Sequence, residues 1–160
     1  MKNKLIIGAF LLYAFSTSIA NDQPVFDDEE HRCLAVAIYK EASGESIIGQ
    51  KAVGHVVLNR VSSPGFPDSV CGVVKQRTKY TCQFSWFCKT TIEQVFIRNK
   101  GVIEVARELL HYKYPDVTGG ALFFHNTSVS PRNGLVRTKQ IGNHIFYRKK
   151  NSHGRNNRGV

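Results

Sequence analysis

The chain has 160 residues, a length that suits one domain with a hydrophobic core of its own. Lysine and arginine number 22 against 12 aspartates and glutamates, so the formal net charge is +10 at pH 7. This charge favours an anionic partner. The sequence carries no nucleic-acid-binding motif, however, so nucleic acid is not the expected partner.

Residues 1–20 have the pattern of a secretory signal peptide. Lys2 and Lys4 form a basic start, residues 5–15 are an apolar run, and Ser18 and Ala20 are small residues before a cleavage site. The run is short for a bilayer span, so an uncleaved anchor is the less favoured alternative. We expect a secreted or periplasmic protein with no stable membrane insertion after cleavage.

The mature chain is then expected to form a single domain over residues 21–148. Residues 149–160 are basic and rich in asparagine and glycine, so this tail is predicted to be disordered.

Four cysteines lie in the mature part, at Cys33, Cys71, Cys82 and Cys88. An even number in an oxidising compartment favours two disulfides, with free buried thiols as the alternative. Three pairings are open. A zinc site is disfavoured because the spacing contains no C-x2-C pair.

Two long helices are expected first. The acidic run 27–30 supplies a cap and an acidic first turn for a helix that ends at Ala42, with Gly44 able to take a left-handed conformation after it. Ser46 or Gly49 begins a second helix that continues to residue 61. Gly54 inside it suggests a close crossing with another helix.

The rest of the chain mixes helices with a small sheet. After a break at 62–67, Asp68 is expected to cap a short helix. Residues 77–89 are aromatic and are predicted as a strand or ordered loop, and residues 90–98 as a helix. Residues 102–112 have the spacing of an amphipathic helix. Strands are predicted at 121–125 and 141–147, so the fold class is a mostly helical α+β domain.

Glu41 is a carboxylate on the apolar face of the first helix, since Leu34, Ala37 and Ile38 precede it by seven, four and three residues. Burial there disfavours the charged form and raises the pKa of the carboxyl group. A carboxylic acid kept protonated near neutrality can act as a general acid. The alternative is a helix-end glutamate that reaches water.

Short segments in consecutive order resemble the SleB/CwlJ-type cell wall hydrolases, in their secreted, cysteine-containing branch. The segment at 38–45 resembles the family signature Y-x-E-A-R-G-E, and Cys82-Gln83-Phe84-Ser85 resembles its C-Q-F-S segment. Further matching segments lie at 49–53, 57–61, 66–74, 119–125 and 141–147. The resemblance extends over about 33–148. One departure is Ser43, where the family usually has arginine, a charge that Lys40 could partly replace.

The resemblance implies a lysozyme-like α+β fold and cleavage of peptidoglycan glycan strands, with Glu41 as the essential glutamate and with no cofactor or metal. Lytic transglycosylation needs one glutamate and is favoured. Lysozyme-type hydrolysis with a second carboxylate is the alternative. An inactive peptidoglycan-binding module is a further one. An amidase or peptidase is disfavoured, since neither a zinc pattern nor a nucleophile motif is visible. Whether an unidentified partner regulates the protein stays open.

Several residues are expected to bind the glycan, because sugar sites combine polar groups with aromatic faces. They are Glu45, Gln83, Phe84, Ser85, His125 and Tyr147. Each has a structural alternative: surface charge for Glu45, core packing for Phe84, and a satisfied structural hydrogen bond for His125. Glu45 is also the only nearby second carboxylate in the sequence.

Overall fold

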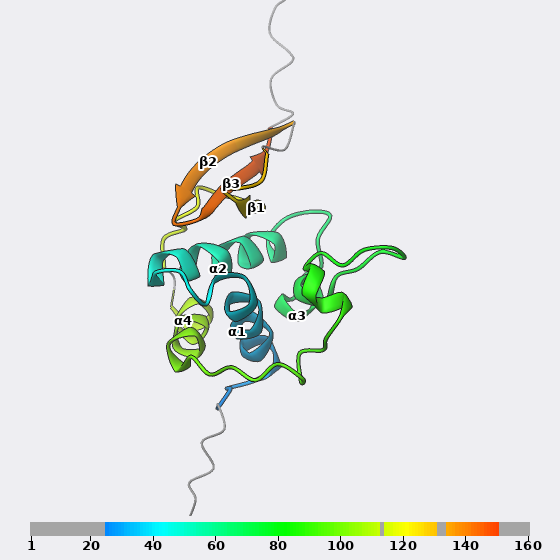
Figure 1. Ribbon diagram of the computed structural model, residues 1–160, viewed down its shortest axis with the longest axis vertical. Helices are drawn as coiled ribbons and strands as arrows, with labels where there is room; N and C mark the ends of the chain where they lie inside the picture. Colours follow the sequence, from blue (N-terminus) through cyan, green and yellow to red (C-terminus); the bar gives the residue numbers. More distant parts are fainter. Residues whose placement is uncertain (1–24, 113, 131–133, 151–160) are drawn as a thin grey trace, which may run out of the picture.

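A computed structural model of the chain describes residues 25–112, 114–130 and 134–150. It consists of a helical body with a small sheet at one end (Figure 1). The predicted signal peptide lies outside the described residues, as do residues 151–160 of the predicted tail. Within the described part, none of the helices is both long enough and apolar enough to cross a bilayer.

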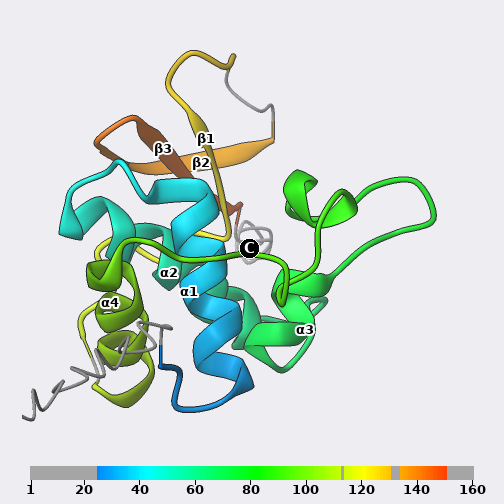
Figure 2. The same cartoon turned by 60° about the horizontal axis from the view of Figure 1, so that its bottom comes forward.

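Helix α1, Glu29–Ala42, forms the centre of the body. Residues 33–38 are all fully buried, which explains their unbroken apolar sequence. The carboxylate of Asp28 accepts a hydrogen bond from the His31 backbone N–H at 2.8 Å and caps the helix, as predicted. Helices α2 (Ile47–Val61), α3 (Val70–Lys75) and α4 (Lys100–His111) pack around α1 (Figure 2).

The close crossing predicted at Gly54 is confirmed. A Cβ atom at this position would overlap the side chain of Leu109 on α4 and lie 3.2 Å from Ile38 Cδ1 on α1. The missing side chain therefore lets three helices meet at one point.

Two predicted caps are wrong in detail. Ser43, with φ −61°, ends α1 in right-handed geometry, and Gly44 is not among the glycines of positive φ. Helix α3 is capped by Ser69 and not by Asp68, because the Ser69 hydroxyl reaches the Gly72 N–H at 3.1 Å. The Glu30 carboxylate accepts from the Val70 N–H at 2.6 Å and so fixes the same turn to α1.

The predicted helix at 90–98 is absent from the structure, where this segment crosses α1 as an irregular chain (Figure 2). Ile92, Val95 and Ile97 are buried at intervals that fit the core surface and not a helical face. The aromatic segment before it is an ordered loop, as expected, closed by a bridge between Arg77 and Cys82. That loop ends in a short 3₁₀ helix, η1, Ser85–Cys88.

The sheet has three antiparallel strands in the order β1-β3-β2, and it packs on α2. Strands β1 (Phe123–Asn126) and β3 (His144–Lys149) correspond to the two predicted strands. Strand β2 (Leu135–Ile141) was not predicted, because its middle is polar and largely exposed. Strand β3 continues through Lys149, so the predicted tail does not begin at that residue.

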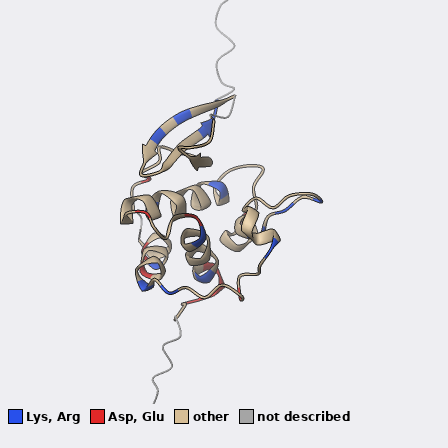
Figure 3. Cartoon of the chain, viewed as in Figure 1, with Lys and Arg blue, Asp and Glu red and all other residues tan. Residues whose placement is uncertain are grey.

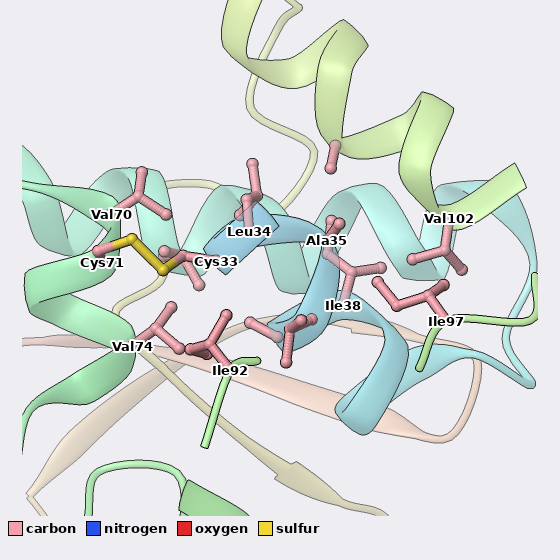
Figure 4. Close-up of a cluster of buried hydrophobic side chains, with 14 of the residues drawn as sticks. Cys33, Leu34, Ala35, Ile38, Val70, Cys71, Val74, Ile92, Ile97 and Val102 are labelled. Atoms are coloured by element: carbon pink, nitrogen blue, oxygen red, sulfur yellow. A yellow bond between two sulfur atoms is a disulfide. The ribbon is translucent and has the colours of Figure 1, made fainter. Parts of the chain in front are cut away.

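The structure also settles the cysteine pairing. Cys33 on α1 is bonded to Cys71 on α3, within the main hydrophobic core (Figure 4). Cys82 is bonded to Cys88 across the loop that contains η1. The first disulfide joins two helices, and the second closes a short surface segment.

Candidate functional site

A cleft of about 300 Å³ lies where the end of α1, helix α2, the aromatic loop and strand β1 meet. Glu41 lies in this cleft together with three of the predicted groove residues, Gln83, Phe84 and Ser85. The remaining lining residues are Arg60, Cys82, Phe123 and Phe124. The cleft thus combines one carboxylic acid, amide and hydroxyl groups, and aromatic faces.

Glu41 lies on the last turn of α1 and is partly buried. Burial raises the pKa of its carboxyl group above the ordinary value, as the sequence pattern predicts. Two weaker effects act in the opposite direction: a hydrogen bond of 2.9 Å from Trp86 Nε1 to Glu41 Oε1, and the charge of Arg60. Burial thus favours the protonated carboxylic acid, whereas Trp86 and Arg60 favour the carboxylate.

Arg60 is a cleft residue that the sequence analysis missed. It is 3% exposed, and its Nε donates to the Leu122 carbonyl at 2.8 Å. Its guanidinium lies over the rings of Phe84 and Phe123, at 5.4 and 5.9 Å. The signal was present: Val53, Val56 and Val57 precede Arg60 by seven, four and three residues. Glu41 has the same apolar spacing on its own helix.

The structure places Glu45 against the sheet. Its carboxylate accepts a hydrogen bond from Asn143 Nδ2 at 3.0 Å and lies 4.0 Å from His144 Nδ1. A Cβ atom at Gly142 would overlap this carboxylate, and the φ of Gly142 is +54°. Glu45 does not line the cleft, so it ties the loop after α1 to the turn between β2 and β3.

His125 and Tyr147 pair with each other on neighbouring strands. Their rings stack with centroids 5.0 Å apart, and His125 Nε2 is hydrogen-bonded to the Tyr147 hydroxyl at 2.9 Å. Tyr147 is 4% exposed. Neither residue lines the cleft, which strand β1 reaches instead through Phe123 and Phe124. Contact of this pair with a glycan stays a prediction.

One group of potential metal ligands lies among the described residues. Glu29, Cys33 and Cys71 place ligand atoms close together. Both sulfur atoms belong to the disulfide between the two cysteines, so they are not available as thiolates.

Comparisons with known proteins agree with this architecture. Residues 44–147 match the family model described as Cell Wall Hydrolase, a range that begins just after Glu41. The chain is 34% identical over 132 residues to a spore cortex-lytic enzyme of Bacillus subtilis, covering 79% of this chain and 40% of that protein. A spore cortex-lytic enzyme of Halalkalibacterium halodurans is 31% identical over 124 residues, covering 76% and 35%. The chain thus spans less than half the length of these relatives.

Two solved structures share the fold. The catalytic domain of the Bacillus cereus SleB protein has a TM-score of 0.64 and 28% identity, covering 78% of this chain and 93% of that domain. The catalytic domain of the germination-specific lytic transglycosylase SleB from Bacillus anthracis has the same score and identity, covering 77% and 97%. The predicted lysozyme-like α+β fold is confirmed.

Proposed function

This chain belongs to the family of cell wall hydrolases, and we propose from that premise that it cleaves peptidoglycan glycan strands at the β-1,4 bond between N-acetylmuramic acid and N-acetylglucosamine. The observation that carries the proposal is the partly buried Glu41 in a cleft lined by polar and aromatic groups. A glycan strand needs such a groove, with an acid positioned beside one glycosidic oxygen.

In the proposed reaction Glu41 protonates the bridging oxygen as the bond to the muramic acid C1 breaks. Trp86 and Arg60 then stabilise the resulting carboxylate. The same carboxylate removes the proton of the muramic acid C6 hydroxyl, which attacks C1 to give a 1,6-anhydro product. The proton that Glu41 gives to the leaving oxygen is replaced by the proton of the C6 hydroxyl, so the reaction needs no water and no other reactant.

The lytic transglycosylase route is preferred because Glu41 is the one carboxylate among the described residues that line the cleft. Hydrolysis of the lysozyme type needs a second carboxylate facing the same bond. The nearest in sequence, Glu45, is engaged with Asn143. The name of the Bacillus anthracis relative, a lytic transglycosylase, also supports this route.

The experiment is a digest of purified sacculi with the mature protein, followed by mass spectrometry of the released muropeptides. We expect 1,6-anhydromuramic ends from the wild type. Glu41→Gln should bind sacculi but lose at least 100-fold in turnover, since it can donate no carboxylic proton. Glu93→Gln, an exposed glutamate outside the cleft, is the matched control and should keep full activity.

Three other results would each point elsewhere. Reducing muramic ends without anhydro products would indicate lysozyme-type hydrolysis. New free amino groups would indicate an amidase or peptidase. Binding without turnover in both wild type and Glu41→Gln would indicate a binding module.

We also propose that the protein acts in the cell envelope, secreted or periplasmic. The two disulfides support this location because they persist in oxidising compartments. Fractionation of cells that express the full chain tests it, with the leader-deleted chain as the control.

A further inference from the structure

A second hollow of about 430 Å³ adjoins the cleft and has no part in the mechanism above. It is lined by Gln76, Arg77, Thr78, Thr81, Cys82 and Gln83. Cys82 and Gln83 also line the catalytic cleft, so the two hollows share one wall. The two hollows therefore lie next to each other at Cys82 and Gln83.

The walls of this second hollow are held in place by the backbone. Residues Arg77 and Cys82 pair as an antiparallel bridge, and the Gln83 N–H donates to the Gln76 carbonyl at 2.8 Å. The hairpin between them projects from the body beside η1, with basic residues along it (Figure 3). The Cys82–Cys88 disulfide fixes its returning strand.

The polar groups of this hollow are complementary to a peptide carboxylate. Arg77 is exposed, and within the described part of the chain no acidic side chain lies within ion-pair distance of it. A ligand carboxylate would supply the anionic partner of Arg77.

The substrate has free carboxylates close to the bond that is cut. In peptidoglycan the lactyl group of the muramic acid carries a peptide stem with amide N–H groups and free carboxylates. Because the proposed cleavage occurs at the muramic acid C1, the stem must leave the cleft close to Glu41. The second hollow meets the cleft at Cys82 and Gln83 and offers a volume of about 430 Å³ beside it.

We propose that the hollow formed by residues 76–83 is a stem-peptide subsite, in which Arg77 pairs with a stem carboxylate. This inference rests on the proposed function and extends it. It makes the enzyme selective for muramic acid that carries a peptide, over glycan from which the peptides have been removed. A guanidinium suits this role because it can form two parallel hydrogen bonds to one carboxylate.

The test compares intact sacculi with the same sacculi stripped of stem peptides by an amidase. We expect wild-type kcat/KM to be about 10-fold higher on peptide-bearing glycan, which corresponds to one good charged contact. Arg77→Gln should lose that preference and keep wild-type activity on stripped glycan. Arg98→Gln, an exposed arginine that lines neither hollow, should behave as wild type.

A binding measurement provides a readout independent of turnover. A soluble stem peptide should bind to Glu41→Gln, and adding Arg77→Gln should weaken that binding about 10-fold. Equal rates on both glycans in the wild type, or an unchanged preference in Arg77→Gln, would overturn the subsite. Wild-type inactivity on both glycans would instead overturn the proposed function. If the peptide still bound in that case, and bound more weakly after Arg77→Gln, the hollow would still be identified as a peptide site.

Discussion

At the scale of single residues, the proton affinity of Glu41 is set by opposing contacts. Burial raises the pKa of the carboxyl group, whereas the Trp86 hydrogen bond and the Arg60 charge lower it. A general acid is active while it is protonated, so rate should fall as pH rises through this pKa. Removing a contact that favours the carboxylate should therefore extend activity to higher pH.

Trp86→Phe tests this balance. The variant keeps an aromatic ring but loses the N–H that donates to Glu41. Since that bond stabilises the charged form, its loss raises the pKa of Glu41, and we expect the basic limb of the kcat/KM profile to move to higher pH. Tyr80→Phe, an exposed aromatic in the preceding hairpin, is the control. If the basic limb did not move, Glu41 would not be the general acid whose pKa sets it.

Glu45→Ala tests whether this residue acts on the fold or on the glycan. Its side chain is 12% exposed and bonds Asn143. If it is a tether, its removal should lower the free energy of unfolding by about 1–3 kcal/mol. Asn143→Ala should give a similar loss, and the double variant should lose less than the sum.

Urea unfolding with the same variants provides the measurement. A rise in KM for sacculi without a change in stability would favour the glycan-binding role that the sequence predicts for Glu45.

The candidate site illustrates what one sequence can disclose about single residues. Glu41 was predicted because a charge on an apolar helix face is anomalous, and Gln83 and Ser85 because polar groups stand beside aromatic ones. The partner of Glu41 was not predictable, since Trp86 lies 45 residues away and meets it only through the fold. Arg60 followed the same rule as Glu41 and was overlooked.

At the scale of elements, the sequence predicted the helices and strands that bury one face or all of their side chains. Helix α1 and the amphipathic helix α4 were both predicted close to their observed bounds. Strand β2 was missed because Arg137, Lys139 and Gln140 face solvent, which leaves no alternation of apolar residues to read. Residues 90–98 were predicted as a helix, but in the structure Ile92, Val95 and Ile97 pack on the core from an irregular chain.

Gly54→Ala tests the crossing of α2 with α1 and α4. The added methyl group meets Leu109 and Ile38 in a packed core, so we expect a loss of about 1–3 kcal/mol in the free energy of unfolding. Gly44→Ala is the matched control, because a Cβ there meets nothing within 4 Å. It should be neutral or raise stability by about 0.4–1 kcal/mol. Thermal unfolding monitored by circular dichroism compares the two, and equal values would contradict the crossing.

At the scale of the whole molecule, the two disulfides have different tasks. Cys33–Cys71 joins α1 to α3 across a separation of 38 residues, within the core. Cys82–Cys88 has a separation of 6 and encloses Gln83, Phe84 and Ser85, all of which line the cleft. Closing a longer loop restricts the unfolded chain more strongly, so the first bond should matter more for stability.

Paired serine substitutions separate these tasks. Cys33→Ser with Cys71→Ser should lower the free energy of unfolding by about 2–4 kcal/mol. Cys82→Ser with Cys88→Ser should lower it less. This pair should reduce kcat/KM on sacculi about 10-fold, because the loop that positions Gln83, Phe84 and Ser85 in the cleft is no longer closed by a covalent bond. Calorimetry and initial rates measure the two effects. The assignment fails if the second pair leaves the rate unchanged.

The disulfide between Cys82 and Cys88, which closes a loop of sequence separation 6, makes the cleft wall dependent on the redox state of its surroundings. While thiols are kept reduced, as they are during synthesis in the cytosol, the wall beside Glu41 is not covalently closed. Oxidation after the proposed export would close it. If the protein is exported as proposed, its activity should be about 10-fold lower before export, when this bond is open, than after the bond has formed.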